Sequence, residues 1–184
     1  MGDPNYQEVA QLLKQGGIIA YPTEAVWGLG CDPANEEATQ RILKLKQRPM
    51  DKGLILVAAD LAQLPTLTAS LEATQLERLG ETWPGPVTWL IPDPDDSIPR
   101  WIKGSHESVA VRVSAHPVVQ AICRAFGGPV VSTSANRSNE PEIRSRLKID
   151  EQFGDSIDLV VAGELGADDS PSRIFDLATG QQIR

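Results

Sequence analysis

Apolar residues recur along the chain in two patterns, one typical of amphipathic helices and one typical of short buried strands. Ala38, Ile42 and Leu45 fall at i, i+4 and i+7, on one face of a helix. Short apolar runs such as residues 87–91 and 108–113 are typical of strands. The alternation of the two patterns predicts an α/β protein. Helices are expected near residues 5–15, 36–47, 70–81, 118–126 and 147–153, and strands at residues 17–21, 54–57, 87–91, 108–113, 129–131, 159–161 and 173–177.

Two of these strands, 87–91 and 108–113, follow each other without an intervening helix pattern. This order breaks a strict strand–helix–strand alternation, so we expect a mixed sheet and not a purely parallel one. The segment Asp93-Pro94-Asp95-Asp96 between them is expected to be an exposed turn and not a domain linker, because strand patterns resume on both sides. A single domain over residues 1–184 is therefore predicted.

Length and composition agree with an ordinary globular protein. A chain of 184 residues is about the size of one domain, and such a domain buries roughly 70% of its unfolded surface. Its 41% hydrophobic and 23% charged residues are typical of globular chains. No apolar run approaches the ~20 residues that a membrane-spanning helix needs. We therefore expect a soluble protein that does not insert into a membrane.

Net charge and cysteine content limit the cellular location and the binding partners that we expect. The formal net charge of -8 argues against a broad nucleic-acid-binding face, although a local basic groove remains compatible with it. Residues 1–4 show no secretory leader pattern, and Cys31 and Cys123 suggest no disulfide framework. A cytoplasmic location is expected, with both cysteines as buried thiols.

A local excess of positive charge lies between residues 41 and 52, where five basic residues accompany one acidic residue. A continuous helix would direct Lys46 and Arg48 apart. Pro49 disfavours helical geometry at Arg48, however, so the helix is expected to end near Gln47. Lys46 and Arg48 can then converge on one phosphate or carboxylate. A solvated basic helix end, favoured by the helix dipole, is the alternative.

Two segments that follow predicted strands are candidate binding loops, because open α/β sheets bind ligands at strand ends. The first, residues 22–30, offers the Thr23 hydroxyl and the pair Gly28-x-Gly30, but the chain has neither a complete dinucleotide fingerprint nor a Walker A sequence. A turn that only reverses the chain is the alternative. The second, residues 132–139, is a dense row of hydroxyl and amide side chains that suits phosphate oxygens. Capping of a helix or turn is its alternative.

Arg112 lies within the apolar strand at residues 109–113. Its burial would require an anionic partner, which a ligand carboxylate could supply. His106 and His116 have no metal-site spacing, so no metal site is expected. The tryptophans are expected to fill the core more than to stack on a base; they include Trp83, Trp89 and Trp101.

Five motifs occur in order along the chain: Tyr21-Pro22-Thr23-Glu24, Lys46-x-Arg48-Pro49, Trp83-Pro84-Gly85-Pro86-Val87-Thr88, Val109-Ala110-Val111-Arg112 and Ser132-Thr133-Ser134-Ala135-Asn136. Together they resemble the YrdC/TsaC family of threonylcarbamoyl-AMP synthases, in its short, single-domain bacterial form. The resemblance extends over nearly the whole chain. It implies a single α/β domain with a twisted mixed sheet, flanking helices and a basic concave cleft.

The resemblance also implies an activity. ATP, L-threonine and bicarbonate or CO2 would become threonylcarbamoyl-adenylate and pyrophosphate. Downstream transferase proteins would use this product for threonylcarbamoyladenosine modification of tRNA. Mg2+ is expected with ATP, and no tightly bound organic cofactor or resident metal is expected.

The resemblance also implies a role for each residue of this chain that matches a motif of the family. Lys46 is expected at the carbamate or α-phosphate, and Arg112 at the threonine carboxylate. Because Lys46 is also expected to be exposed in the cleft, Lys46→Ala should abolish turnover and leave the fold intact. The implied catalytic residues are Lys46, Arg48, Ser134 and Asn136. The implied ATP-binding residues are Arg48, Lys52, Ser134, Asn136 and Arg184. The implied threonine-binding residues are Thr23, Thr88, Arg112, Ser132 and Ser172.

Two other functions remain open at this level. The first is a binding module whose local basic groove holds tRNA or a ribosomal precursor RNA without catalysis. Binding by charge alone would tolerate alanine at Ser134 and Asn136, and it would depend strongly on salt. The second is an enzyme with the same scaffold and another substrate. Weak tRNA binding is compatible with the synthase function as well.

Overall fold

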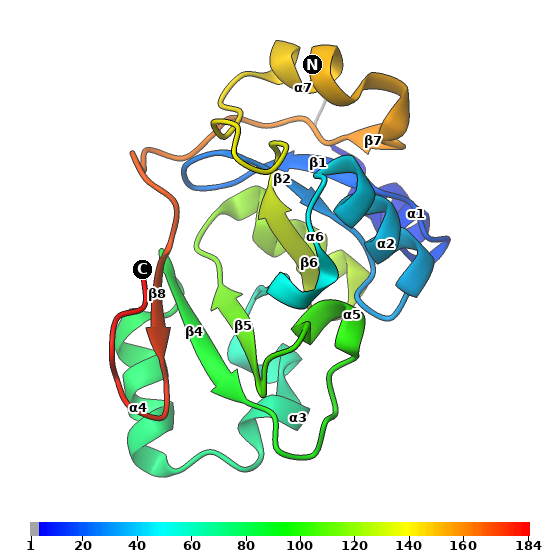
Figure 1. Ribbon diagram of the computed structural model, residues 1–184. Coiled ribbons are helices and arrows are strands. Elements are labelled where there is room, and N and C mark those ends of the chain that lie inside the picture. Colours follow the sequence, from blue (N-terminus) through cyan, green and yellow to red (C-terminus); the bar gives the residue numbers. More distant parts are fainter. Residues whose placement is uncertain (1–3) are drawn as a thin grey trace.

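The computed structural model describes residues 4–184 of the chain. Residues 1–3, which carry most of the segment used to judge a secretory leader, lie outside the described part. The strands form one eight-stranded sheet with helices on both sides (Figure 1). The strands are β1 (Ile19–Pro22), β2 (Trp27–Gly30), β3 (Ile55–Ala58), β4 (Val87–Pro92), β5 (Ser108–Val113), β6 (Val130–Ser134), β7 (Leu159–Val160) and β8 (Arg173–Asp176).

The strand order across the sheet is β7-β1-β2-β6-β3-β5-β4-β8. Three neighbouring pairs are parallel, namely β1–β7, β3–β5 and β4–β8. The other four pairs are antiparallel, so the sheet is mixed, as the sequence predicted. The order brings β6 between β2 and β3, which places segments far apart in the sequence next to each other.

The helices begin and end at residues that suit their termini. Asn5 and Asn35 cap the first two long helices by accepting backbone hydrogen bonds, and Gly127 ends another in the left-handed region, at φ 89°. The α-helices are α1 (Tyr6–Lys14), α2 (Glu36–Leu45), α3 (Pro65–Thr68), α4 (Ala73–Thr82), α5 (Arg100–Lys103), α6 (Pro117–Phe126) and α7 (Arg146–Phe153), and the short 3-10 helices are η1 (Met50–Lys52), η2 (Leu61–Gln63) and η3 (Gly154–Ser156).

Alternate residues of the strands enter two separate cores, one on each face of the sheet. Ile19 and Tyr21 of β1 pack in a cluster with side chains of α1 and α6. Ile18 and Ala20 instead enter the larger cluster, which includes Ile42 of α2. This period of two is the usual strand geometry. Both faces of the central strands are therefore buried, which fits their nearly continuous apolar sequences.

The structure corrects several sequence predictions. Residues 22–30 were expected to form a loop, but β2 occupies the second half of this segment and pairs with both β1 and β6. Gly28 and Gly30 of this strand have no side chain and so contribute nothing to an apolar pattern in the sequence. In the structure both pack against Tyr21. Helices α3 and α5 were not predicted. Asp93, expected in an exposed turn, is buried, whereas the following three residues are exposed.

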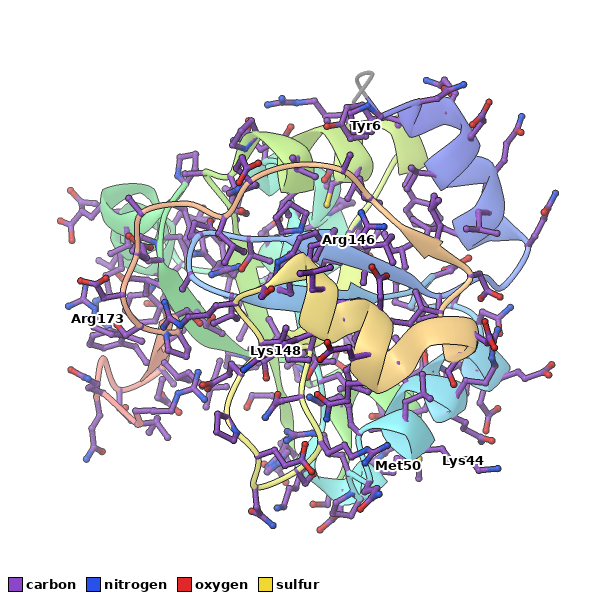
Figure 2. All side chains as sticks on the ribbon, turned by 90° about the horizontal axis from the view of Figure 1, so that it is seen from above. Tyr6, Lys44, Met50, Arg146, Lys148 and Arg173 are labelled. Atoms are coloured by element: carbon purple, nitrogen blue, oxygen red, sulfur yellow. The ribbon has the colours of Figure 1, made fainter. Side chains whose placement is uncertain are left out.

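Helix α7 lies above the β1–β2 end of the sheet, and its Arg146 and Lys148 are exposed (Figures 1 and 2). Within residues 4–184, no helix is long and apolar enough to cross a membrane. Trp89 is buried, and Trp83 and Trp101 pack against the same core, as expected. Both cysteines are buried free thiols, also as expected.

Candidate active site

A cavity of about 140 Å³ opens where β1 and β6 end and where β5 carries Arg112. It is bounded by the first loop after β1, by the end of β6 and by residues 168–172, which precede β8. Four of the expected threonine-binding residues line it: Thr23, Arg112, Ser132 and Ser172. Arg48, Ser134 and Arg184 line it as well.

A second cavity, of about 190 Å³, lies next to the first. Three of the residues expected to bind ATP, Arg48, Lys52 and Arg184, line it over an apolar floor that includes Leu54 and Ile102. Arg48 and Arg184 line both cavities. Most of the expected threonine-binding residues thus line the first cavity and three of the expected ATP-binding residues line the second, whereas Ser134 lines the first cavity and Asn136 lines neither.

The Lys46 amine is buried beneath the end of β6 and does not line either cavity. Its Nζ donates to the backbone oxygens of Ser134 and Asn136 and, at 3.2 Å, to Asn136 Oδ1. Asn136 Oδ1 also accepts from Ser134 Oγ at 2.6 Å. Three residues of the expected tetrad therefore form one hydrogen-bonded unit. The expectation that Lys46 is exposed is wrong, since only 3% of the residue is accessible.

Burial changes the acid–base behaviour of Lys46. Removal of the amine from water, and then the neighbouring Arg48 charge, lower the pKa of Lys46 to about 8. The amine is thus poised to change charge slightly above neutral pH. Its position follows from the end of α2, because Gln47 has a φ of 50° and turns the chain just after Lys46.

Arg48 is held by backbone oxygens and not by a carboxylate. Its Nε and Nη2 donate to Gly53 O at 3.2 and 3.0 Å. Burial, and then the nearby positive charge of Arg184, lower the pKa of Arg48. Arg184 is fixed in turn, because its Nη2 donates to Ser172 O at 3.1 Å and its backbone pairs with Ile174 of β8. Two adjacent cations of this kind favour an anion between them. Arg48 and Lys46 contact different groups and do not share a partner in the structure.

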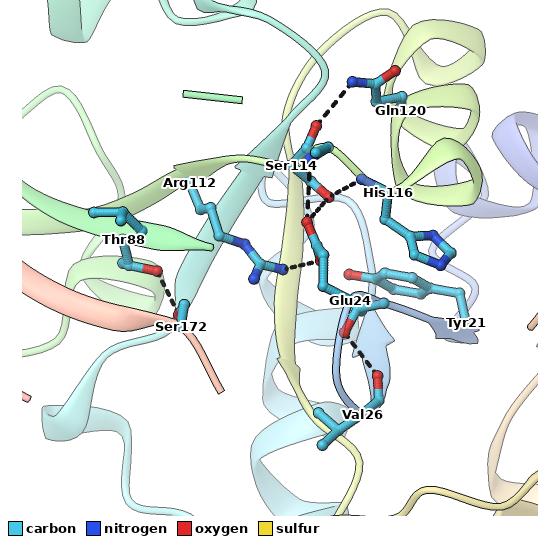
Figure 3. A network of polar contacts seen from close by, with 12 residues as sticks. Tyr21, Glu24, Val26, Thr88, Arg112, Ser114, His116, Gln120 and Ser172 are labelled. Carbon is cyan, nitrogen blue, oxygen red and sulfur yellow. Dashed lines mark hydrogen bonds and ion pairs between the residues drawn. The ribbon is translucent and has the colours of Figure 1, made fainter. Parts of the chain in front are cut away.

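Arg112 has an anionic partner within the chain. Its Nη2 lies 3.1 Å from Oε2 of Glu24, and both side chains are about nine-tenths buried. Glu24 thus supplies an anionic partner from within the chain, and a ligand carboxylate as a further partner stays a prediction (Figure 3). No role in the site was expected for Glu24. A carboxylate directly before the apolar run Ala25-Val26-Trp27 was the signal that could have indicated it, because a buried charge needs a partner.

The remaining expected threonine-binding residues are hydroxyl groups with defined partners. Thr88 is fully buried behind the cavity wall, and its Oγ1 lies 2.8 Å from Ser172 Oγ. Thr23 Oγ1 donates to Val26 O at 2.7 Å. The structure therefore places Thr23, Ser132 and Ser172 at the cavity and Thr88 behind Ser172.

Acidic residues also line the first cavity and were not expected there. Glu142 and Asp168 join Glu24, so three acidic residues face three arginines in its lining. The basic concave cleft implied by the sequence stays a prediction. Among the described residues, no group of three or more histidine, cysteine, aspartate or glutamate side chains could hold a metal ion.

A mixed sheet flanked by helices, with two adjoining cavities that share Arg48 and Arg184 in their linings, places the chain in the class of α/β proteins. The chain belongs to the Sua5/YciO/YrdC family, since the model of this family, described as telomere recombination, matches residues 11–184.

Relatives of this chain include a threonylcarbamoyl-AMP synthase of Pseudomonas paraeruginosa. It is 54% identical over 97% of this chain and 95% of its own length. A solved structure of P. abyssi Sua5 complexed with L-threonine is similar at 31% identity, with a TM-score of 0.86. That match covers 94% of this chain, which spans about half (51%) of the P. abyssi protein. E. coli YciO matches with a TM-score of 0.85 and 25% identity over 97% of this chain and 87% of its own.

Proposed function

We propose that this protein is a threonylcarbamoyl-AMP synthase, a nucleotidyltransferase that joins L-threonine, CO2 or bicarbonate and ATP. The observation that carries the proposal is the pair of adjoining cavities that meet at Arg48 and Arg184. One cavity offers an arginine and hydroxyl groups to an amino acid, and the other offers cations to a polyphosphate. The family membership and the 54% identity to a synthase support the same function.

The first cavity suits threonine by size and by chemistry. Its volume of about 140 Å³ suits a small molecule. Arg112 would pair with the threonine carboxylate, and Thr23, Ser132 and Ser172 would bind polar groups of the amino acid. Thr88 would act from behind by holding the Ser172 hydroxyl, which lies 2.8 Å away.

The second cavity would bind MgATP, with Lys52 and Arg48 on the phosphates and Arg184 beside them. The α-phosphate would then lie at the boundary of the two cavities, between Arg48 and Arg184. The Ser134 hydroxyl would bind a phosphate or magnesium-linked oxygen, and Asn136, which lines neither cavity, would act from behind by holding that hydroxyl at 2.6 Å. The Ser134 hydroxyl and the Glu142 and Asp168 carboxylates line the first cavity and are oxygen ligands of the kind that Mg2+ prefers.

The reaction requires positioning more than a nucleophilic side chain. The threonine amine attacks CO2 and loses a proton, which forms a carbamate. A carbamate oxygen then attacks the α-phosphorus of ATP as the bond to pyrophosphate breaks. Both reactants are anions and repel each other, so cations fixed beforehand would accelerate the step by orientation and by charge stabilisation. Lys46 would hold Ser134 and Asn136 in place and add its positive charge to the site.

The product would be a labile activated donor for tRNA modification. Downstream tRNA threonylcarbamoyl transferase proteins would consume it, and the activity would therefore lie in the cytoplasm. Weak tRNA binding by this protein would be compatible with such a transfer.

The test is pyrophosphate release from MgATP, with threonine and bicarbonate each present or omitted, at low salt and without tRNA. Release that requires both co-substrates is expected. Absence of release, together with tight and salt-sensitive tRNA binding by the same preparation, would instead indicate the RNA-binding module.

Ser134→Ala tests the proposed site directly. The substitution removes a cavity hydroxyl and its hydrogen bond to Asn136, so kcat is expected to fall about 100-fold, as for loss of one preorganised donor. Ser70→Ala, at an exposed position outside both cavities, is the matched control and should leave turnover unchanged. Normal turnover in folded Ser134→Ala protein would contradict the assignment.

A further inference from the structure

The carboxylate of Glu24 is held rigidly at the edge of the first cavity. Only 8% of the residue is exposed. Its Oε1 accepts a hydrogen bond from Ser114 Oγ at 2.6 Å and another from the Ala115 backbone at 3.2 Å (Figure 3). Both donors belong to the turn between β5 and α6, so two contacts fix the orientation of the carboxylate. Hydrogen bonds to a charged acceptor are among the stronger ones in proteins.

The guanidinium of Arg112 is held from one side only. Its one polar contact within residues 4–184 is the ion pair with Glu24 Oε2, at 3.1 Å, and the pair is not aligned as a hydrogen bond. Within the described part of the chain, every Arg112 nitrogen either has a partner or is accessible. The N–H donors that do not face Glu24 therefore reach the cavity that Arg112 lines. An arginine carries five N–H donors, which leaves several for a ligand.

A covering segment, residues 164–168, closes over Glu24. Asp168 N donates to Glu24 O at 3.0 Å, and Gly166 N donates to Thr23 O at 2.9 Å. The packing is close, because a Cβ atom on Gly166 would lie 2.6 Å from Glu24 O. His116 Nε2 lies 3.1 Å from Glu164 O and joins the same segment to the turn after β5. The covering segment thereby holds the backbone of Thr23 and Glu24 in place beside the ion pair.

We infer that Glu24 is a positioning residue for the amino-acid substrate: it fixes the Arg112 guanidinium so that the unused donors meet the substrate carboxylate. This inference rests on the proposed function and deepens it. An unrestrained arginine loses side-chain entropy when it binds a ligand, whereas a guanidinium held in advance has already lost it. Glu24 restrains the Arg112 guanidinium and leaves the N–H donors that face the cavity free for the ligand.

The charge state of Glu24 suits this role. Burial alone would raise the pKa of the Glu24 carboxyl, but the Arg112 charge and the Ser114 hydrogen bond outweigh burial and lower it. The carboxylate therefore stays ionised at neutral pH, and the ion pair with Arg112 is maintained.

The test is Glu24→Gln in the full-length protein, in the pyrophosphate-release assay. Displacement of a positioning group by about 1 Å can cost up to about 100-fold, so the KM for threonine is expected to rise about 10- to 100-fold. The kcat and the KM for ATP should stay near their wild-type values, because Arg48 and Arg184 are untouched. Ser114→Ala, which keeps both charges and removes one hydrogen bond to Glu24, should raise the same KM by a smaller factor. Glu8→Gln, on the exposed side of α1, is the matched control.

Threonine amide separates positioning of Arg112 from a merely structural role. The amide lacks the carboxylate, so the wild-type protein should prefer threonine, and Glu24→Gln should reduce this preference by about the factor by which its KM for threonine rises. The inference would be overturned if Glu24→Gln lowered kcat/KM equally for threonine and for threonine amide. It would also be overturned if the KM for threonine in Glu24→Gln were unchanged or lower. If Glu24→Gln does not fold, the same comparison in Ser114→Ala decides the question. Absence of threonine-dependent release by the wild-type protein would instead overturn the proposed function.

Discussion

At the scale of single residues, buried charged groups organise this site. Lys46 is 3% exposed and directs its amine to three oxygens of Ser134 and Asn136. Arg112 and Glu24 form a buried pair on the other side of the cavity. Burial of a charged group costs free energy, and such groups concentrate at sites where they orient reacting groups or stabilise charge. These residues therefore connect the fold to the proposed chemistry.

Lys46→Met should reduce stability as well as activity. The substitution leaves carbonyl oxygens of Ser134 and Asn136 without their donor, which costs about 1–3 kcal/mol for a buried polar group. Urea denaturation measures this loss. Lys44→Met, at an exposed position two residues earlier, is the matched control and should change stability by less than about 0.5 kcal/mol. Unchanged stability in Lys46→Met would show that the amine has no structural role.

The pKa of Lys46 also predicts a pH dependence. The amine is a cation below about pH 8 and becomes neutral above it, so kcat/KM for ATP should fall as pH rises through about 8. Stability should change in the opposite direction. Because the folded-state pKa lies below the ordinary value of 10.5, the unfolded state binds more protons between pH 8 and 10.5, and this group's contribution to stability rises over that window. A flat rate profile from pH 7 to 9 would contradict the assignment.

At the scale of elements, short segments around the second cavity depend on one buried ion pair. Lys103, at the end of α5, contacts Asp93 Oδ2 at 2.8 Å, and both side chains are 2% exposed. Helix α5 in turn contacts the segment that holds Arg48, because Leu54 N donates to Ile102 O at 2.8 Å. The ion pair thereby supports Gly53, whose carbonyl oxygen accepts from Arg48.

Asp93→Asn should destabilise the protein by about 1–3 kcal/mol at neutral pH, because it removes the buried carboxylate and leaves Lys103 with the exposed Asp96, 2.5 Å from its Nζ, as its one anionic partner in the described part of the chain. Burial would raise the Asp93 pKa, but hydrogen bonds from Lys103 and Ser97 outweigh it and lower the pKa to about 2. The stability from this carboxylate is present above pH 3.8 and is lost as pH falls through about 2. The difference between variant and wild type should therefore shrink in acid.

Asp95→Asn is the matched control for this experiment, since Asp95 lies in the same turn and is exposed. Denaturant unfolding at pH 7 should leave this control within about 0.5 kcal/mol of the wild type. Equal stability of Asp93→Asn and Asp95→Asn would mean that the ion pair does not hold α5.

At the scale of the whole molecule, the site joins both halves of the chain. The first cavity includes the loop after β1 and the end of β6, and residues 168–172 close it before β8. The chain near Arg184 returns to pair with β8 and brings this arginine to both cavities. Ligands that contact all of these segments should therefore stabilise the whole fold.

Threonine together with a non-hydrolysable ATP analogue and Mg2+ should raise the Tm. At 100-fold excess over Kd, one ligand adds about 2.7 kcal/mol, and a domain of this size gains about 2–4 °C per kcal/mol. An increase of about 5–10 °C is therefore expected for each ligand in a thermal-shift experiment, and about twice that for both together. Each ligand alone serves as the comparison, and no increase with all ligands present would contradict the assignment of both cavities.

Much of the fold is encoded in local patterns of the sequence. The apolar periods predicted α1, α2, α6 and most strands, because the side-chain repeat of a helix or strand depends only on neighbouring residues. The consecutive strands β4 and β5 likewise indicated a mixed sheet. The ordered motifs predicted membership of the family, which the match over residues 11–184 confirmed.

The partners of the buried charges were decided by the tertiary structure alone. The order β1-β2-β6-β3-β5 brings Glu24 to Arg112 and the end of α2 to the end of β6. No local pattern encodes this order, because strand neighbours and their register depend on contacts between distant segments. For the same reason the sequence indicated cations and hydroxyl groups for the site, whereas only the folded chain showed the burial of Lys46, the Glu24–Arg112 pair and the two cavities that meet at Arg48 and Arg184.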